Sequence, residues 1–167
     1  MNVAEAIAVI DKHVSNPTDG LPDEIFYFVS EMTPLVNVDL LIKDENGRTL
    51  LAWRNDKYAG EGWHVPGGII RLKETMKQRL QKVAETEIGT KVEFELNPIA
   101  INELIVPRKT RCHFVSFLYK CRPPKNFVPE NKGLKKTDPG YLMWHSSCPD
   151  NLIECQKIYK ENINRNI

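Results

Sequence analysis

The sequence predicts an α/β fold in which a mixed β-sheet lies between helices. Three observations predict it: β-forming runs begin near residue 35, one amphipathic helical stretch interrupts them, and a second helical stretch closes the chain. Strands on both sides of a central helix fit an α/β/α sandwich. We place this sandwich at residues 33–167, after an N-terminal helical extension at residues 1–32. A chain of 167 residues is long enough for one domain with an adequate core.

The N-terminal extension is expected to hold two short helices. Residues 3–14 carry apolar side chains at helical spacing, and the sequence Asn-Pro-Thr-Asp-Gly at 16–20 then breaks the helix. Pro22 is expected to open a second short helix that runs to Val29.

The remaining elements follow from β-forming runs and turn residues. The turn Asp44–Gly47 contains an Asn-Gly pair, which suits a hairpin between the first two strands. Residues 122–138 are polar and rich in proline, as in a surface loop, and a last helix is expected over 152–159. The expected strands cover residues 35–43, 48–54, 63–66, 91–106, 111–121 and about 140–145.

Composition limits the class of protein. A formal net charge of +1 with 27% charged residues gives no strong attraction to nucleic acid or to an anionic membrane. No apolar run approaches the roughly 20 residues that span a bilayer, and the N-terminus lacks the basic start of a signal peptide. The four cysteines show no C-x-x-C spacing, so we expect reduced thiols in a cytoplasmic protein without a zinc site.

The central helix carries an acidic residue on its apolar face. At the ~100° per residue of an α-helix, Glu87 lies about 20° from Met76, on the side that also holds Leu80 and Val83. Burying a carboxylate is costly unless a cation holds it, which points to a metal ion. The glycine pair Gly67-Gly68 before this helix leaves backbone groups free to bind phosphate or metal.

The same segment resembles the signature of the Nudix hydrolases. Gly68, then Glu74, then Glu87-Ile88-Gly89 match the skeleton of the Nudix box. Of the family's three helix carboxylates, at the positions of Val83, Thr86 and Glu87, this chain has only the last. Glu85 cannot replace the others because it points roughly 160° away from Glu87. The resemblance therefore implies one metal ion rather than a cluster.

Residues 33–90 are similar to the GDP-mannose mannosyl hydrolases, a Nudix branch that keeps only the final helix glutamate. This resemblance implies that Mg²⁺ binds to Glu87 and to the carbonyl of Gly67, and that Arg54 assists the departure of the diphosphate. The catalytic histidine of that branch has no counterpart in residues 138–144. The remaining positions implied by the resemblance are Asp39, Gly68 and Lys82 for the substrate and Asp138 for the metal.

Several of these residues also have purely structural interpretations. Glu87 has Lys91 at i+4 as an ion-pair partner, and Asp39 interrupts an apolar strand where a buried, hydrogen-bonded role is equally expected. Asp138 precedes Pro-Gly, which is typical of a turn. The histidines His64 and His113 lie in strand patterns, where packing is commoner than catalysis.

The functional hypothesis is a Mg²⁺-dependent Nudix hydrolase acting on a nucleoside diphosphate derivative, above all a nucleotide sugar such as GDP-mannose. Its partner would be a small-molecule nucleotide, with no nucleic acid and no membrane. The apolar residues of the extension further predict a homodimer. Two alternatives stay open: a non-catalytic module that binds a nucleotide metabolite, and a nucleotide pyrophosphatase in which water attacks phosphorus with Glu103 as base.

Overall fold

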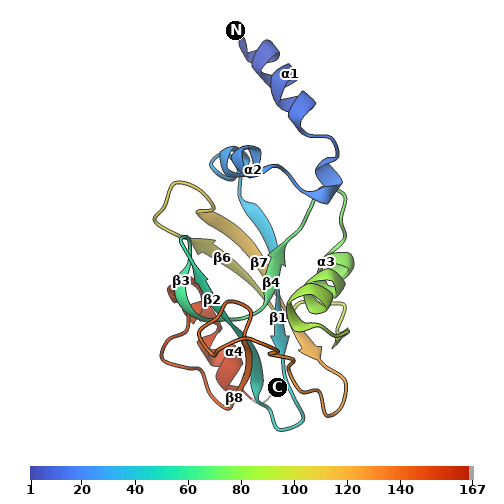
Figure 1. Ribbon diagram of the computed structural model, residues 1–167, viewed down its shortest axis with the longest axis vertical. Coiled ribbons are helices and arrows are strands. Elements are labelled where there is room, and N and C mark those ends of the chain that lie inside the picture. Colours follow the sequence, from blue (N-terminus) through green and yellow to red (C-terminus); the bar gives the residue numbers. More distant parts are fainter. Residues whose placement is uncertain (166–167) are drawn as a thin grey trace.

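The computed structural model describes residues 1–165 and confirms the predicted α/β/α sandwich. Figure 1 shows strands in the middle of the molecule, α3 on one side, α4 on the other, and α1 extending away from the sheets. The helices are α1 (Val3–His13), α2 (Asp23–Ser30), α3 (Met76–Val83) and α4 (Lys160–Asn164). The strands are β1 (Leu35–Ile42), β2 (Thr49–Asp56), β3 (Gly60–His64), β4 (Gly67–Ile69), β5 (Glu93–Phe94), β6 (Ala100–Ile105), β7 (His113–Arg122) and β8 (Leu142–His145).

The strands form two sheets. One has the order β4-β1-β7-β5, with β6 also paired to β7, and the other has the order β3-β2-β8. The central pair, β1 and β7, is parallel, and every other pairing is antiparallel. The sheet of β1 is therefore mixed, as the sequence predicts.

Both faces of β1 are covered, which explains its apolar sequence. Leu40 and Ile42 pack with Leu80 and Val83 of α3, whereas Leu41 packs in a second cluster with Tyr159 and other residues of the C-terminal segment. Alternate residues of a strand face opposite sides of the sheet, so Asp39 shares the face of Leu41. Asp39 is the only strand acid among residues 1–165 with less than a tenth of its surface exposed, and it thus points toward the C-terminal segment.

The prediction of one long strand over 91–106 is wrong. Two separate strands, β5 and β6, lie in that range, and Pro98 stands between them. Proline has no backbone N–H to donate to a ladder, so Pro98 interrupts the pairing with β7 that β5 and β6 share. The glycine pair belongs to a further short strand, β4, in which Gly67, Gly68 and Ile69 pair with β1.

Two helices differ from the predicted ones in type. The central helix begins with a capping box between Thr75 and Gln78, and its last turn, Ala84–Ile88, is a π-helix closed by the left-handed Gly89. The closing helix is a 3₁₀ segment, Glu154–Tyr159, followed by α4. No helix of the described residues 1–165 is long and apolar enough to cross a membrane.

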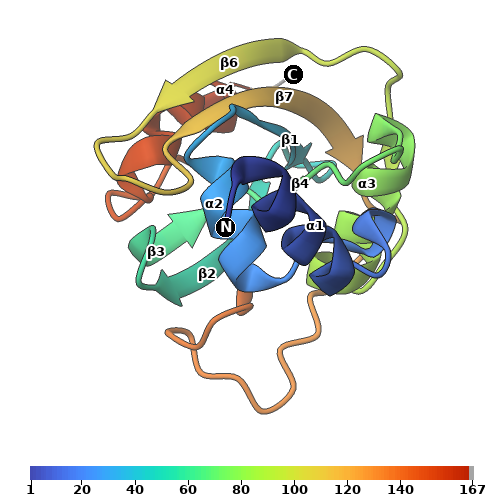
Figure 2. The same ribbon diagram turned by 90° about the horizontal axis from the view of Figure 1, so that it is seen from above.

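The two helices of the extension behave differently. None of the residues of α1 is buried, and Figure 2 shows α1 lying above the sheets when the molecule is seen from above. By contrast, α2 contacts the turn between β6 and β7, where the Arg111 N–H donates to the buried Ser30 Oγ at 3.0 Å. Glu31 also pairs with Lys109 of this turn, at 3.2 Å.

Candidate active site

A small pocket lies where β1, β3 and β4 meet the β6–β7 turn. Its volume is about 160 Å³, and its lining is rich in charged and polar side chains. Of the predicted site residues, Asp39, Arg54, Gly67 and Gly68 line it. His64, Tyr58, Arg108, Arg111, Ser116 and Gln156 also contribute to the wall.

Glu87 borders this pocket from the last turn of the central helix. Its Oε2 lies 3.9 Å from His64 Nε2, and the backbone N–H of Gly67 faces its carboxylate. Desolvation raises the pKa of Glu87 from 4.5 to about 7, against the opposing effect of the Arg54 charge. Glu85 is exposed, so the two acids meet different surroundings. Glu87 is thus a partly buried carboxylate beside the glycine pair of β4, the condition that favours binding of a cation.

His64 is a neutral wall of the pocket. Its Nδ1 lies 2.7 Å from the carbonyl of Ala52, which can only accept, so Nδ1 carries the hydrogen and Nε2 faces Glu87 as a bare acceptor. Burial and the Arg54 charge lower the pKa of His64 to about 3. A strand histidine that the sequence assigns to packing is in fact part of the pocket lining.

Asp39 connects three parts of the fold. Its Oδ2 accepts hydrogen bonds from Ser116 Oγ of β7 and from Tyr159 Oη, at 2.6 Å for the tyrosine, and Oδ1 accepts from Asn37 at 2.9 Å. Burial raises the pKa of Asp39 above its ordinary range, and these three donors oppose that rise. Asp39 therefore has a structural role and a face on the pocket at the same time.

We expect Asp39→Ala to lower the free energy of unfolding by about 2–3 kcal/mol, because the buried hydroxyls of Ser116 and Tyr159 lose their shared acceptor. Urea unfolding followed by fluorescence measures the change. Asp138→Ala is the matched control: its carboxylate accepts one backbone N–H, from Lys135, in a surface loop, and less than about 1 kcal/mol should be lost. Equal losses in the two variants would contradict the role given to Asp39.

The glycine pair brings backbone, not side chains, close to Asp39 and α3. A Cβ on Gly67 would collide with Asp39 Oδ1 and would lie 2.8 Å from the carbonyl oxygen of Val38. A Cβ on Gly68 would lie 2.9 Å from a methyl of Val83 and 3.1 Å from Arg79. Gly67 thus makes room for the acid of β1, whereas Gly68 allows the close packing of α3.

Arg54 is held at the mouth of the pocket by a neighbour on its own strand. Its Nε lies 3.2 Å from Asp56 Oδ2, and a third of the side chain is exposed. The carboxylate of Asp56 also accepts the backbone N–H groups of Tyr58 and Ala59, both at 2.8 Å. The charge of Arg54 lowers the pKa of Glu87, in opposition to the effect of burial.

Two predicted site residues lie away from the pocket lining. Lys82 is exposed on α3, and Asp138 uses its carboxylate to accept the Lys135 N–H in the loop before β8.

Glu103, the base of the pyrophosphatase alternative, pairs with His113 at 3.0 Å, while its neighbour Leu104 is the residue that lines the pocket. Because alternate strand residues face opposite sides, Glu103 points away from the pocket.

The sequence interpretation missed Arg108 and Arg111. Residues 107–110 were expected to be only a connection between strands, and Arg111 the first residue of the next strand, but both arginines line the pocket together with Arg54. The available signal was the number of cations in the stretch Pro-Arg-Lys-Thr-Arg. That signal cannot tell which cations turn toward a site, since this depends on how β6 and β7 pair.

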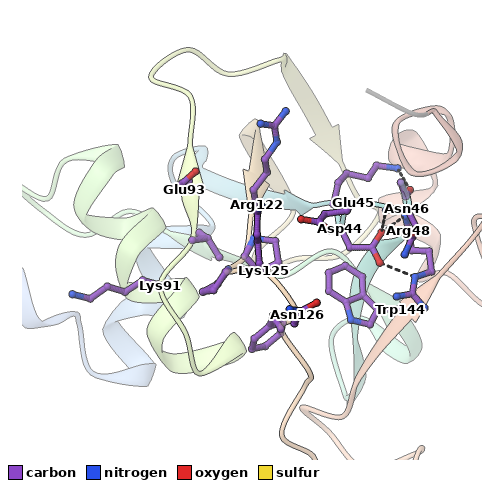
Figure 3. Close-up of a pocket in the computed structure, with 16 residues that line it drawn as sticks. Asp44, Glu45, Asn46, Arg48, Lys91, Glu93, Arg122, Lys125, Asn126 and Trp144 are labelled. Atoms are coloured by element: carbon purple, nitrogen blue, oxygen red, sulfur yellow. Dashed lines mark hydrogen bonds and ion pairs between the residues drawn. The ribbon is translucent and has the colours of Figure 1, made fainter.

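A larger hollow of about 1040 Å³ lies elsewhere, beside the β1–β2 turn and the start of the 122–138 loop. Figure 3 shows that Lys91 and Arg122 point away from one another rather than toward a common centre. Asp44 and Arg48 form an ion pair with each other, at 2.7 Å, within the β1–β2 turn. The side chains of this hollow do not converge, so we place the candidate site at the smaller pocket.

Comparisons with known proteins identify the family and the fold. The family model described as the NUDIX domain matches residues 33–144. A 79-residue stretch is 39% identical to the low-salt glycan biosynthesis protein Agl8 of Haloferax volcanii, covering 47% of this chain and 50% of that protein. The chain therefore matches only about half the length of this relative.

Solved structures show the same fold. A MutT NUDIX hydrolase from Burkholderia pseudomallei has a TM-score of 0.61 and 22% identity, over 78% of this chain and 98% of that one. A UDP-X diphosphatase has a TM-score of 0.56 and 18% identity, over 96% of this chain and 87% of that one. Together with a family model that matches well over half of the residues, these findings establish that the chain belongs to the Nudix family of hydrolases.

Proposed function

We propose that the protein is a Mg²⁺-dependent hydrolase of a nucleoside diphosphate linked to another group, in particular a nucleotide sugar such as GDP-mannose. The observation that carries the proposal is a single desolvated carboxylate, Glu87, beside a pocket that holds several arginines. The similarity to a glycan biosynthesis protein favours a sugar, and the fold shared with a UDP-X diphosphatase favours a nucleoside diphosphate.

The residues present fit a magnesium ion that shares its ligands with substrate. Mg²⁺ prefers oxygen ligands, keeps several waters, and commonly binds through one or two carboxylates plus substrate phosphates. Glu87 and the Gly67 carbonyl would hold it, since Asp39 already accepts three hydrogen bonds. Within residues 1–165, no group of three or more His, Cys, Asp and Glu could hold a metal without such help. A bound ion would neutralise the diphosphate and stabilise the leaving group.

The chain's own residues supply charge and shape. The guanidinium of Arg54 would stabilise the negative charge that develops on the departing diphosphate. His64, which stays neutral at physiological pH, leaves Glu87 free of an ion pair and available to the metal. Ser116 and Tyr159 hold the carboxylate of Asp39 by hydrogen bonds, and Gly67 packs closely against this carboxylate.

A substrate screen tests the proposal. Nucleotide sugars, free nucleoside diphosphates and triphosphates are incubated with the protein and Mg²⁺ in ¹⁸O-water, and the products are identified by mass. We expect turnover of a nucleotide sugar, with ¹⁸O in the sugar for attack on carbon or in a phosphate for attack on phosphorus. Binding of a nucleotide sugar without turnover would instead support the non-catalytic module.

We further propose that the protein pairs as a homodimer through α1. An isolated helix of this length is marginal in water, and α1 exposes half or more of the surface of Val3 and Ile7. Sedimentation equilibrium should give a dimer for the full chain and a monomer for a chain that starts at residue 16. A full-length monomer at micromolar concentration would contradict the proposal, and an unaltered dimer after truncation would place the interface elsewhere.

A further inference from the structure

We infer that Arg108 and Arg111 bind the diphosphate of the substrate together with Arg54, and that α2 of the N-terminal extension holds the turn that carries them. The inference rests on the proposed function only for the class of substrate. Arg108, Lys109 and Arg111 belong to the connection between β6 and β7, which we name the arginine turn (residues 106–112).

Arg108 is held in the pocket wall by two hydrogen bonds and keeps further N–H donors free. Its Nη1 donates to the carbonyl of Tyr58 at 2.5 Å, and its Nε donates to the carbonyl of Arg111 at 2.9 Å. A guanidinium has five N–H donors, so three remain for another acceptor. Because both observed partners are backbone oxygens, the positive charge of Arg108 is not neutralised by them.

Arg111 has a donor that no protein group satisfies. Its guanidinium carbon lies 4.9 Å from the centre of the Tyr58 ring, so the aromatic face supports the cation from one side. Its Nε is buried and has no hydrogen-bond partner among the described residues. The backbone of Arg111 also has a φ of 51°, which is uncommon for a residue with a side chain. A strained residue with an unmatched buried donor is typical of a ligand-binding position.

The pocket concentrates positive charge. Arg54, Arg108 and Arg111 all line a volume of about 160 Å³, and the neighbouring charges of Arg54 and Arg108 act together with burial to lower the pKa of Arg111. Asp56 is the acid that opposes this effect, and it is already paired with Arg54. Three cations close together repel one another, so a multiply charged anion bound among them would relieve this repulsion. A diphosphate supplies that charge, and its oxygens match the planar fork of a guanidinium.

The arginine turn depends on α2 for its position. The backbone N–H of Arg111 donates to Ser30 Oγ, whose own hydrogen goes to the carbonyl of Tyr27 at 2.8 Å. Tyr27 packs against Tyr58, with ring centres 5.5 Å apart. Tyr58 is the residue whose ring supports the guanidinium of Arg111. The second helix of the extension therefore holds Arg111 and its supporting ring through one hydrogen bond and one aromatic contact, besides the exposed ion pair of Glu31 with Lys109.

The test measures binding of inorganic pyrophosphate by calorimetry in the presence of a chelator, so that no metal contributes. We expect Arg111→Ala to weaken binding by about 10- to 100-fold, the usual effect of losing hydrogen bonds to a charged group. Lys109→Ala is the matched control: it removes a cation of the same turn whose side chain is 84% exposed, and it should change binding by less than about twofold. Arg111→Lys keeps the charge and should recover only part of the loss, because the fork is gone.

Ser30→Ala tests the role of α2 as a positioning element. It removes the acceptor of the Arg111 N–H and should raise the KM for the substrate found in the screen about three- to tenfold, with kcat nearly unchanged. The inference would be overturned if the wild type, Arg111→Ala and Lys109→Ala bound pyrophosphate equally, or if the wild type did not bind it. Either result would leave the proposed hydrolase function uncontradicted. Loss of pyrophosphate binding in Arg111→Ala would support it even if no nucleotide in the screen were hydrolysed.

Discussion

Glu87→Gln is expected to lower kcat for metal-dependent hydrolysis by about 10²- to 10³-fold. The substitution keeps the size of the side chain but removes the charge that would hold the ion, and a catalytic ion supplies several kcal/mol of transition-state stabilisation, each 1.36 kcal/mol being tenfold in rate. Initial rates over a range of Mg²⁺ concentrations measure the effect. A large part of the loss should appear as a higher Mg²⁺ requirement.

Glu85→Gln is the matched control, because Glu85 lies on the same π-helical turn but is exposed. Its kcat should stay within about twofold of the wild type. If the two variants lose activity equally, the assignment of the metal to Glu87 is wrong.

The metal-free Glu87→Gln protein should not be less stable than the wild type at pH 8. The folded-state pKa of about 7 exceeds the ordinary value of 4.5, so the contribution of Glu87 to stability is complete below pH 4.5 and is lost as the pH rises through 7. Glutamine cannot ionise, and we expect a gain of about 1–2 kcal/mol at pH 8, after allowance for the exposed third of the side chain. Thermal unfolding at pH 4.5 and pH 8 separates this effect from a folding defect.

Gly67→Ala is expected to remove activity by about a hundredfold or more and to destabilise the protein by about 2–4 kcal/mol. The added Cβ collides with the carboxylate of Asp39 and comes within 2.8 Å of the Val38 carbonyl, so β4 must leave β1 or Asp39 must lose its partners. Either movement shifts the backbone that faces Glu87. Activity and urea unfolding are measured on the same preparation.

Gly68→Ala is the comparison for this prediction. Its Cβ meets side chains of Val83 and Arg79, and the Arg79 side chain can move. We expect Gly68→Ala to lower the stability of the protein as well. For each kcal/mol of stability lost, however, it should lose less activity than Gly67→Ala does. Equal ratios in the two variants would mean that Gly67 acts only through the fold.

The parts of the fold that the sequence predicts well are those with a local cause. The apolar run of β1, the Asn-Gly turn after it and the capped central helix each carry their own signal. The break between β5 and β6 had a local signal too, in Pro98, but the β-forming residues on both sides outweighed it. The pairing of Gly67–Ile69 with β1 had no such signal, since it depends on contacts between distant segments.

The candidate site divides in the same way. Helical periodicity alone places Glu87 on a buried face, and the structure puts it beside the glycine pair. Arg54 and Asp39, two of the residues that the resemblance implies, line one pocket, whereas Lys82 and Asp138 are not part of its lining. Arg108 and Arg111 could not be assigned from the sequence, because only the antiparallel pairing of β6 with β7 and the contact with α2 turn them inward.

The most direct test of the account is a titration with Mn²⁺ followed by electron paramagnetic resonance, on the wild type and on the Glu87→Gln and Glu85→Gln variants. With Val83 buried in the core and Thr86 bonded to the carbonyl of Lys82, the central helix offers one carboxylate toward the pocket. We therefore predict one weak site per chain in the wild type and in Glu85→Gln, and none in Glu87→Gln. Two tight sites, or a site that persists in Glu87→Gln, would contradict a single metal held by Glu87.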